Sequence, residues 1–536
     1  MNGAQSLFKA LTDAGLDTCF ANPGTSEMQL VYEMGRTDSV RPILCLQESV
    51  VTGAADGYAR MAGKPAFTLL HVGSGFANGI ANLHNAGRAN TPIINIVGAN
   101  ATYHQPNFPE HELISGRITD IAGPVSHWTR EARSAAELGA LGAEAVRHAM
   151  TGCGRISTLV APTNCHWDPA PAPPVASAPV ARPAVAQAAI AEAASQLGNG
   201  RRTGLLLGAH ALHDEALELA GRIAAATGAQ LLGETFPARL ARGEGRVQVQ
   251  LVPYFLEMAT PFLAEYEQLI LVGAQPPVST FAYQNAVTHK ASPDCELWTL
   301  ASPDQDLCGA LQALAEAVGA GDAAPARQPR VEPPAPTGPL ASGAIGQSVA
   351  RLLPENAILV DESATAGLEL YANSMGARKH EYLYAIPGGA IGNGLPAALG
   401  ASIACPERKV VALQADGSGM YTNQALWSMA RENCDITVVV LKNDAYAVLN
   451  VELARVREGD PTPGMLSMLE LDRPSIDWVK LAEGMGVPAV AVASAEDFDA
   501  QFARAMAESG PRLIEASIAQ DLQPVVDLIM MQRQQS

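Results

Sequence analysis

The sequence lacks paired cysteines. Its eight cysteines are scattered over 536 residues, and no two of them form a Cys-x-x-Cys pair. Scattered thiols predict a reduced cytoplasmic protein without a disulfide framework or a cysteine zinc site. The first residues also lack the segments of a signal peptide, and no uncharged apolar run reaches the about 18 residues of a membrane-spanning helix. We therefore expect a cytoplasmic protein that makes no contact with a membrane.

A surplus of basic residues is missing as well. Lys and Arg number 35 against 54 Asp and Glu, which gives a formal net charge of -19. Nucleic acids and anionic membranes bind to basic faces that release counterions, so the charge balance argues against both as partners. A small anionic substrate or cofactor remains compatible with the sequence if a local group holds its negative charge.

Two Pro/Ala-rich stretches, 168–186 and 323–340, interrupt the apolar patterns of the chain. Such stretches favour an extended backbone over packed elements. They predict three domains, at 1–170, 187–322 and 341–536, each of ordinary domain size. The alternative is that both stretches are long surface loops of one domain.

Within each part, short apolar runs alternate with amphipathic stretches. The strand-like runs are 65–72, 92–99, 203–209, 268–274, 356–362, 408–417 and 435–444. Repeated strand–helix–strand units predict an α/β protein with three open parallel-sheet domains. Ligands of such sheets bind at the carboxyl ends of the strands, so we expect the functional residues in the loops that follow them.

The most specific signal lies in the third part. Asp416 and Asn443 each follow an apolar strand, and neighbouring parallel strands end at the same sheet edge. One carboxylate, one amide oxygen and a nearby backbone carbonyl, assigned to Ala445, form an incomplete Mg²⁺ site that phosphate oxygens and water complete. Glycines let backbone N–H groups approach that phosphate. The alternative for this motif alone is a strand-to-helix turn with an Asp N-cap.

Asp-Gly-Ser followed by an Asn at the end of a Val-rich strand is similar to the thiamine diphosphate signature. Further segments agree in order and spacing: 22–25, 46–48, 70–71, 387–392 and 395–398. The chain resembles the pyruvate decarboxylase/acetolactate synthase superfamily, and within it the benzoylformate decarboxylases most. This resemblance implies the thiamine diphosphate-binding fold for the first domain, which binds the pyrimidine, and for the third, which binds the diphosphate and Mg²⁺. It implies a Rossmann-like middle domain, in which no sequence motif supports flavin binding.

The resemblance also implies roles for individual residues. Glu48 matches the glutamate that hydrogen-bonds N1′ of the cofactor's aminopyrimidine and assists removal of the C2 proton. Gly389 matches the carbonyl that accepts from the 4′-amino group, and Ile391 the apolar wedge that bends the cofactor. The other implied cofactor-binding residues are Gly417, Ser418, Ser363, Thr365 and Tyr446. For a lone Glu48 or Ile391, a helix-terminal charge or ordinary core packing is the alternative.

Two residues favour the decarboxylases over the acetolactate synthases. His71 stands where benzoylformate decarboxylases have a proton-transferring histidine, and Thr25 stands where they have a substrate-binding serine. A second active-site histidine has no clear match, and His104, His111 and His127 fit a solvated loop or the mouth of the cleft. Glu452 replaces a bulky aromatic residue of the decarboxylases, which predicts a smaller or more polar substrate than an aryl 2-oxo acid.

The sequence thus predicts a thiamine diphosphate- and Mg²⁺-dependent enzyme that decarboxylates a small 2-oxo acid, with carboligation as a further outcome. One alternative is an acetolactate synthase-type carboligase, and another is a non-catalytic paralogue with a binding role. The resemblance implies a homodimer with shared active sites, usually as a homotetramer.

Overall fold

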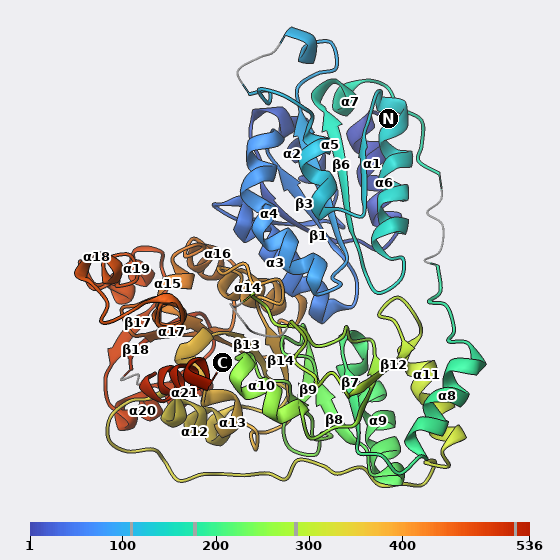
Figure 1. Ribbon diagram of the computed structural model, residues 1–536. Coiled ribbons are helices and arrows are strands. Elements are labelled where there is room, and N and C mark those ends of the chain that lie inside the picture. Colours follow the sequence, from blue (N-terminus) through green and yellow to red (C-terminus); the bar gives the residue numbers. More distant parts are fainter. Residues whose placement is uncertain (108–110, 175–179, 283–287, 519–521, 536) are drawn as a thin grey trace.

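The computed structural model describes residues 1–107, 111–174, 180–282, 288–518 and 522–535. Three mostly parallel β-sheets, each flanked by helices, form the protein (Figure 1), which confirms the predicted fold class. The Pro/Ala-rich stretch 323–340 runs extended along the lower edge of the molecule. In the other stretch, residues 175–179 lie outside the described part of the chain. No helix in the described ranges is long and apolar enough to cross a bilayer.

The first sheet carries six parallel strands in the order β2-β1-β3-β4-β6-β5. Its strands are β1 (Thr18–Asn22), β2 (Arg41–Leu44), β3 (Ala66–Leu70), β4 (Ile93–Ala99), β5 (Trp128–Glu131) and β6 (Ile156–Pro162). The α-helices of this region are α1 (Gly3–Asp13), α2 (Met28–Met34), α3 (Glu48–Ala62), α4 (Val72–Arg88), α5 (Ile118–Ala122), α6 (Ala135–Ala149) and α7 (Thr163–Trp167). Short 3₁₀ turns are η1 (Thr25–Glu27), η2 (Gln105–Asn107) and η3 (Gly123–Val125). β3, β4 and β6 are buried along their whole length, as continuous apolar strands of a covered parallel sheet should be.

The second sheet is parallel and follows the order β10-β8-β7-β11-β12. Its strands are β7 (Thr203–Leu207), β8 (Gln230–Gly233), β10 (Gln250–Leu251), β11 (Gln268–Val272) and β12 (Glu296–Ala301). The helices around it are α8 (Gln187–Leu197), η4 (Ala209–Leu212), α9 (Asp214–Thr227), α10 (Leu256–Leu263) and α11 (Leu307–Ala317). The order reverses beside β7, and in doubly wound sheets such a reversal opens a crevice at the strand ends.

The third sheet has the order β17-β18-β16-β15-β13-β14-β9. Its strands are β13 (Ile358–Glu362), β14 (His380–Tyr384), β15 (Val410–Ala415), β16 (Ile436–Lys442), β17 (Ala489–Val492), β18 (Arg512–Ser517) and β9 (Leu240–Arg242). The helices are α12 (Ser342–Leu352), η5 (Ala364–Gly367), α13 (Leu370–Asn373), α14 (Gly394–Ala404), α15 (Asp416–Gly419), α16 (Ala425–Arg431), α17 (Ala447–Val456), α18 (Pro463–Leu466), α19 (Trp478–Gly484), α20 (Ala495–Ala507) and α21 (Gln523–Gln535). Strand β9 pairs antiparallel with β14, so a segment of the predicted middle domain completes this sheet.

Helices α3 and α14 join the first sheet to the third at backbone contact (Figure 1). A Cβ atom on Gly57 would lie 2.0 Å from the Ala397 carbonyl oxygen, and one on Gly400 would lie 1.9 Å from that of Ala54. Only glycine permits such an approach, because any side chain would collide with the facing backbone. The contact places the N-terminus of α3 near the loop that precedes α14.

Arg60, in the last turn of α3, connects all three regions. Its guanidinium forms a buried ion pair with Asp56 and donates to the carbonyl oxygens of Ala238 (3.3 Å) and Tyr384 (2.7 Å). Asn393 donates to the same Asp56 carboxylate at 2.9 Å. A buried ion pair offsets its desolvation only when further hydrogen bonds satisfy it, and here they come from every region.

Candidate active site

Asp416 and Asn443 lie together at the carboxyl ends of β15 and β16, where the register pairs Ala415 with Leu441. One carboxylate oxygen of Asp416 accepts from the Gly417 N–H at 2.8 Å. The other accepts from the N–H groups of Asn443 (3.1 Å) and Asp444 (2.7 Å). The Asn443 side-chain oxygen accepts from the Ala445 N–H at 3.2 Å. The turn after β16 is thus folded around the Asp416 carboxylate.

Asp416 is 1 % exposed, and burial raises the pKa of its carboxyl group despite three N–H donors. Backbone dipoles therefore do not fully replace the lost water. A divalent cation would supply the missing charge, and the oxygen set of Asp416, Asn443 and a turn carbonyl suits Mg²⁺. The residues present fit that ion together with a diphosphate.

The loop 387–393 forms the other side of this half of the site. Gly389 adopts φ +79°, and a Cβ there would meet no atom within 4 Å, so its backbone faces open space. Ile391 is half-buried and packs against the core cluster that contains α3 and α14. The roles of Gly389 as a cradle and Ile391 as a wedge for an aminopyrimidine stay predictions.

Glu362, at the end of β13, holds this loop, and it was not among the residues predicted from the sequence. Its carboxyl group accepts from the Gly392 N–H at 2.5 Å and from the Gly394 N–H. Burial raises the pKa of Glu362 to about 7. The residue thereby fixes the backbone on either side of Asn393, next to Gly389 and Ile391. The sequence signal for Glu362 was an acidic residue at the end of an apolar strand. The Asp361-Glu362 pair is, however, equally typical of a solvated strand terminus.

The predicted hydroxyl contacts are partly engaged within the protein. Ser418 Oγ accepts from Gln414 Nε2 at 2.6 Å and donates to the Ala415 carbonyl at 3.3 Å. Ser363 Oγ donates to Asp361 at 2.6 Å, while Thr365 is buried in η5. Tyr446 packs on Gly417, where a Cβ would lie 2.6 Å from the phenol ring. The Gly417 N–H is likewise engaged by Asp416, so contact between this turn and a diphosphate stays a prediction.

The other half of the site lies at the strand ends of the first sheet. Glu48 is the first residue of α3, and its Oε2 accepts from Asn78 of α4 at 3.0 Å. A Cβ on Gly75 would lie 2.8 Å from Glu48 Oε1 and 3.3 Å from His71 Cβ. Thr25 follows Gly24, which lies so close to His71 that a Cβ atom on Gly24 would collide with the His71 ring. The structure therefore gathers the three predicted residues Glu48, His71 and Thr25.

Glu27 is a further residue of this half that the sequence did not single out. Its Oε2 lies 2.8 Å from His71 Nδ1 and accepts from the Gly24 N–H at 2.7 Å. The Glu27 side chain is fully buried, whereas 23 % of the His71 side chain is exposed. A buried carboxylate on Nδ1 fixes the ring and leaves Nε2 as the outward nitrogen. The sequence signal for Glu27 was its place in the Asn-Pro-Gly-Thr-Ser-Glu turn. Its contact with His71 could not be predicted from that turn, because the contact depends on how the strands pair in the sheet.

Two of the other histidines fall in different settings. The His111 ring lies 5.7 Å from the His71 ring, centroid to centroid, so His111 does reach this half of the site. His127 is instead exposed at the opposite end of the sheet, where its ring accepts from the Ile156 N–H. Residues 108–110, within the predicted histidine-containing loop, lie outside the described residues.

The two halves meet through α4 and the loop 387–393. Asn82 donates to the carbonyl oxygens of Ser49 (2.9 Å) and Gly392 (3.3 Å), and Asn85 donates to that of Ala390 (2.7 Å). In the described part of the chain, Glu48 makes its side-chain hydrogen bond to Asn78 and none to the Asp416 cluster. One chain thus presents both halves without joining their reactive side chains.

Comparison with known protein families matches each half of the site to a family domain. The model of the thiamine pyrophosphate enzyme N-terminal TPP binding domain matches residues 1–121, and that of the C-terminal TPP binding domain matches 370–516. The chain belongs to the thiamine pyrophosphate enzyme family. It is a thiamine diphosphate-dependent enzyme homologous to benzoylformate decarboxylase and acetolactate synthase.

Individual relatives agree over almost the whole chain. A provisionally named acetolactate synthase large subunit, IlvX of Mycobacterium tuberculosis, is 45% identical over 97% of this chain and 99% of its own. Benzoylformate decarboxylase of Pseudomonas aeruginosa is 29% identical over 95% of this chain and 97% of its own. The solved structure of a Rhodococcus jostii thiamine diphosphate-dependent 4-hydroxybenzoylformate decarboxylase has a TM-score of 0.82 and 24% identity, covering 97% of this chain and 100% of that one. The similarity to this solved structure is evidence for the fold only.

Proposed function

We propose that this thiamine diphosphate enzyme uses Mg²⁺ and decarboxylates a small 2-oxo acid without oxidation. The observation that carries the proposal is His71, held by the buried Glu27 and placed beside Glu48 around Gly75. A fixed imidazole next to a carboxylate provides proton donors and acceptors on one wall of the site. When bound, thiamine diphosphate supplies a nucleophilic carbon that adds to the 2-oxo carbonyl and takes the electron pair released with CO₂.

Asp416, Asn443 and the Ala445 carbonyl would hold Mg²⁺, and the Gly417–Ser418 backbone would face the diphosphate. Glu48 would hold a proton at N1′ of the aminopyrimidine. Gly389 would accept from its amino group, and Ile391 would press the ring into a bent shape. His71 Nε2 would give a proton to the carbon that loses CO₂, with Thr25 orienting the substrate carboxylate.

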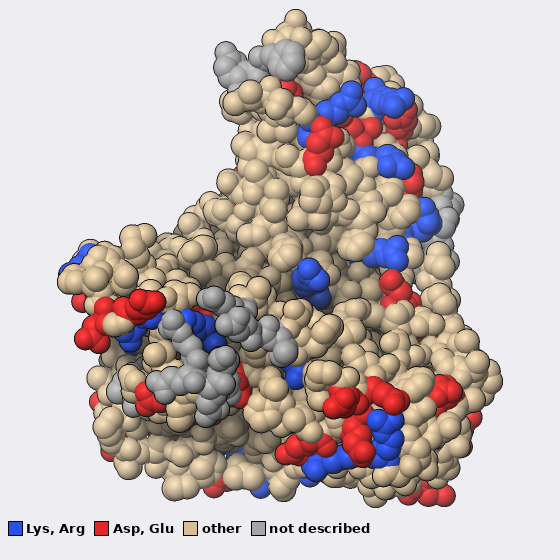
Figure 2. All heavy atoms as spheres, viewed as in Figure 1, with Lys and Arg blue, Asp and Glu red and all other residues tan. Residues whose placement is uncertain are grey.

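We propose that a second copy of the chain completes each site, so that Glu48 of one subunit faces Asp416 of the other. Large apolar side chains are exposed around both halves: Met28, Tyr32 and Leu46 on one, and Leu368, Tyr421 and Leu449 on the other. Charged side chains are sparse over α2, α3 and α4 and gather at the left-hand, lower and right-hand edges (Figure 2). Groups of exposed large apolar side chains are typical of an interface, and they support a homodimer that pairs into a tetramer.

The proposed substrate is smaller or more polar than an aryl 2-oxo acid. On helix α17, Glu452 Oε2 lies 2.9 Å from Arg455 Nε, and Val451 is buried. A charged pair on α17 would disfavour binding of a substrate's phenyl ring beside this helix. The free cysteines support the cytoplasm as the compartment. The sheet arrangement supports domains at 1–170, 187–322 and 341–536, apart from β9, which lies within 187–322 but joins the third sheet.

A panel of 2-oxo acids, tested with thiamine diphosphate and Mg²⁺, examines the proposal directly. We expect CO₂ and the matching aldehyde from small aliphatic or polar 2-oxo acids, and lower rates from benzoylformate. Parallel reactions with an added aldehyde acceptor would reveal carboligation. Release of CO₂ from no member of the panel would contradict the proposal and favour the non-catalytic paralogue.

Acetolactate synthesis is the second candidate, because IlvX carries that name at 45% identity. In that reaction a second 2-oxo acid, in place of a proton, would meet the carbon that has lost CO₂. His71, held ready for proton transfer, favours the decarboxylase. Incubation with pyruvate alone separates the two, since acetolactate identifies the carboligase and acetaldehyde the decarboxylase.

Glu27→Gln should lower kcat by about 10²-fold, at the lower end of the effect of a general acid–base group. The amide keeps the size of Glu27 but removes the charge that orients His71 through Nδ1. We expect unchanged affinity for thiamine diphosphate and an altered pH profile of kcat. Glu33→Gln is the matched control, because Glu33 is also buried but hydrogen-bonds Asn2 and Gln29. An unaltered pH profile in Glu27→Gln would contradict a role through His71.

A further inference from the structure

Two segments of the C-terminal half of the site, the loop 387–393 and the Gly417–Ser418 turn, are separate in the sequence but adjacent in the structure. Thr422, just after the turn, donates from Oγ1 to the Gly392 carbonyl oxygen at 2.8 Å. A Cβ atom on Gly392 would lie 3.6 Å from the Ser418 carbonyl oxygen. Thiamine diphosphate is predicted to contact both segments, so the residues that fix their separation should affect how well the cofactor binds.

Two polar side chains, Glu362 and Gln414, lie side by side next to these segments. β13 and β15 are parallel neighbours, and their register pairs Glu362 with Gln414. Paired residues of neighbouring strands point to the same face of the sheet, and here both are buried, at 1 % and 0 % exposure. A Cβ atom on Gly394 would lie 2.9 Å from Glu362 Oε2 and 2.3 Å from Gln414 Oε1, so both side chains reach the start of α14.

Each of the two side chains binds one of the segments. The Glu362 carboxyl group accepts from the N–H groups of Gly392 and Gly394. Gln414 Nε2 donates to Ser418 Oγ at 2.6 Å. Gln414 is the one polar residue of β15, whose other residues are Val, Ala and Leu. A glutamine buried in such a strand is destabilising unless its amide is hydrogen-bonded, so its contacts should account for its presence.

A hydrogen bond between the two side chains completes the connection. Gln414 Oε1 is buried and has no hydrogen-bond partner among the described residues, although buried polar atoms are normally paired. Burial raises the pKa of Glu362 to about 7, so its carboxyl group can carry a proton near neutral pH and donate it to Oε1. An ionised carboxylate would instead accept from Nε2 once the amide had turned over. Either arrangement joins Glu362 to Gln414.

We propose that Glu362 and Gln414 are a pair of positioning residues that hold the loop 387–393 and the Gly417–Ser418 turn at the separation that thiamine diphosphate requires. The pair acts through these two segments, from the buried ends of β13 and β15. Preorganised segments lose less conformational freedom when a ligand binds, so the connection should raise the affinity for the cofactor. The inference rests on the C-terminal TPP binding domain of the chain and not on the proposed decarboxylation.

A double-mutant cycle on cofactor affinity tests this connection, with thiamine diphosphate titrated calorimetrically into each protein at fixed Mg²⁺. Gln414→Leu should weaken binding about 10-fold, because it leaves Glu362 and Ser418 without their shared partner. Glu362→Leu should weaken it by at least about 10-fold, because it also releases two glycine N–H groups. In the Glu362→Leu background, adding Gln414→Leu should cost less than about twofold, because the connection is already broken.

Glu362→Gln is the conservative variant. Its amide can still bind Gln414 and one of the two glycine N–H groups, so its cofactor affinity should lie between those of wild type and Glu362→Leu. It also provides the second background for the cycle if Glu362→Leu does not fold, which thermal unfolding of the cofactor-free protein reveals. A merely structural role would lower the unfolding midpoint without the non-additive effect on affinity.

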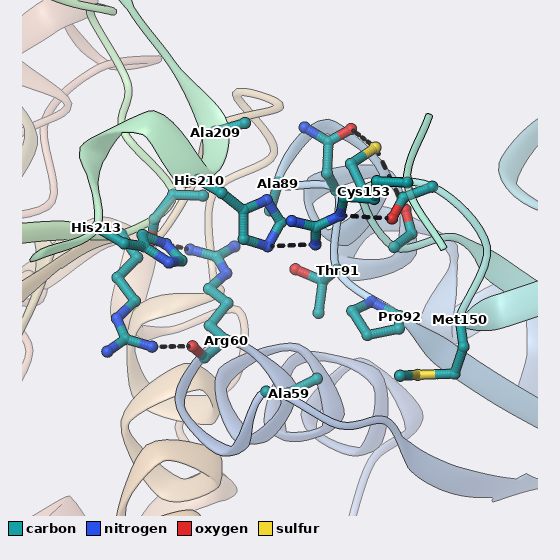
Figure 3. A pocket seen from close by; sticks show the side chains of 17 residues that line it. Ala59, Arg60, Ala89, Thr91, Pro92, Met150, Cys153, Ala209, His210 and His213 are labelled. Carbon is teal, nitrogen blue, oxygen red and sulfur yellow. Dashed lines mark hydrogen bonds between the residues drawn. The ribbon is translucent and has the colours of Figure 1, made fainter. Parts of the chain in front are cut away.

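Two matched controls lie in the second sheet. Gln268 is a fully buried strand glutamine whose Nε2 donates to Thr203 Oγ1 at 2.6 Å. Glu234 directly follows β8, and burial raises its pKa to about 7. It accepts from the N–H of Ala209 at 3.3 Å, and Figure 3 shows Ala209 at the edge of the pocket between the first and second sheets. We expect Gln268→Leu and Glu234→Gln to bind thiamine diphosphate like wild type.

Two results would overturn the proposal. One is wild-type cofactor affinity in Gln414→Leu, and the other is an equal loss from Gln414→Leu in the wild-type and Glu362→Leu backgrounds. Because cofactor affinity is measured without turnover, this test is independent of the substrate. A protein that binds the cofactor as expected but releases no CO₂ from any 2-oxo acid would contradict the proposed function alone.

Discussion

Asp416→Asn is expected to remove thiamine diphosphate binding at ordinary cofactor concentrations, and activity with it. Loss of an outer-shell partner costs a metal site about 10–100-fold in affinity, so loss of a direct carboxylate ligand should exceed about 100-fold. The amide also replaces one oxygen that accepts backbone N–H groups with an NH₂ group that opposes them. The turn 443–445 would then lose its anchor. Calorimetric titration with thiamine diphosphate at fixed Mg²⁺ measures the effect.

Asp444→Asn is the control for this experiment. Asp444 donates its backbone N–H to Asp416, but its carboxylate accepts from Ser475 Oγ at 2.8 Å, away from the proposed metal. We expect nearly unchanged cofactor affinity in this variant. Excess Mg²⁺ should restore part of the binding in Asp416→Asn if the residue acts through the metal. Equal affinities in wild type and Asp416→Asn would contradict the assignment of Asp416.

Strand ends were the part of the site that the sequence predicted best. The apolar runs before Asp416 and Asn443 are long and uninterrupted, and parallel pairing of successive strands is the rule in α/β proteins. These two facts place both residues at one edge without knowledge of any contact. The same reasoning applies to His71, which follows β3 directly. The fold class follows from the same alternation of strands and helices.

Contacts between distant segments could not be predicted in the same way. Glu27 reaches His71 only because β1 and β3 are neighbours, and nothing in either local sequence specifies that pairing. Glu362 binds loop N–H groups about thirty residues away, although its strand end resembles any acidic terminus. Strand β9 joins the third sheet from within the predicted middle domain, since three residues carry too little pattern to reveal their partner.

Segments 74–83 (SGFANGIANL) and 389–399 (GAIGNGLPAAL) are similar in sequence, and the structure brings them into contact. Both present small residues and Asn-Gly before an apolar helix pattern, and in the structure α4 lies against the loop before α14. Asn82, within the first segment, donates to the Gly392 carbonyl oxygen of the second, and Asn85, two residues beyond the first segment, donates to that of Ala390. Small residues are needed on both sides, because backbone carbonyl groups of one segment receive side chains of the other.

Glu48→Gln should give the opposite pattern to Asp416→Asn, with cofactor binding retained and turnover lost. Glutamine can still hydrogen-bond a ring nitrogen and Asn78, but it cannot exchange a proton at N1′. Because acid–base groups contribute about 10²–10⁴-fold, we expect a fall of that size in kcat. Loss of the C2 proton of bound thiamine diphosphate, followed by deuterium exchange, should slow in parallel.

The pair of variants also tests the shared site. If Glu48 of one subunit serves the cofactor held by Asp416 of the other, each single variant is impaired at every site. A mixed dimer of Glu48→Gln and Asp416→Asn chains then contains one site with both residues intact and one with neither. Mixing the two inactive proteins under conditions of subunit exchange should therefore restore activity, up to about a quarter of wild type when dimers form at random. Sites built within one chain would stay inactive after mixing, because each chain would keep its own defect.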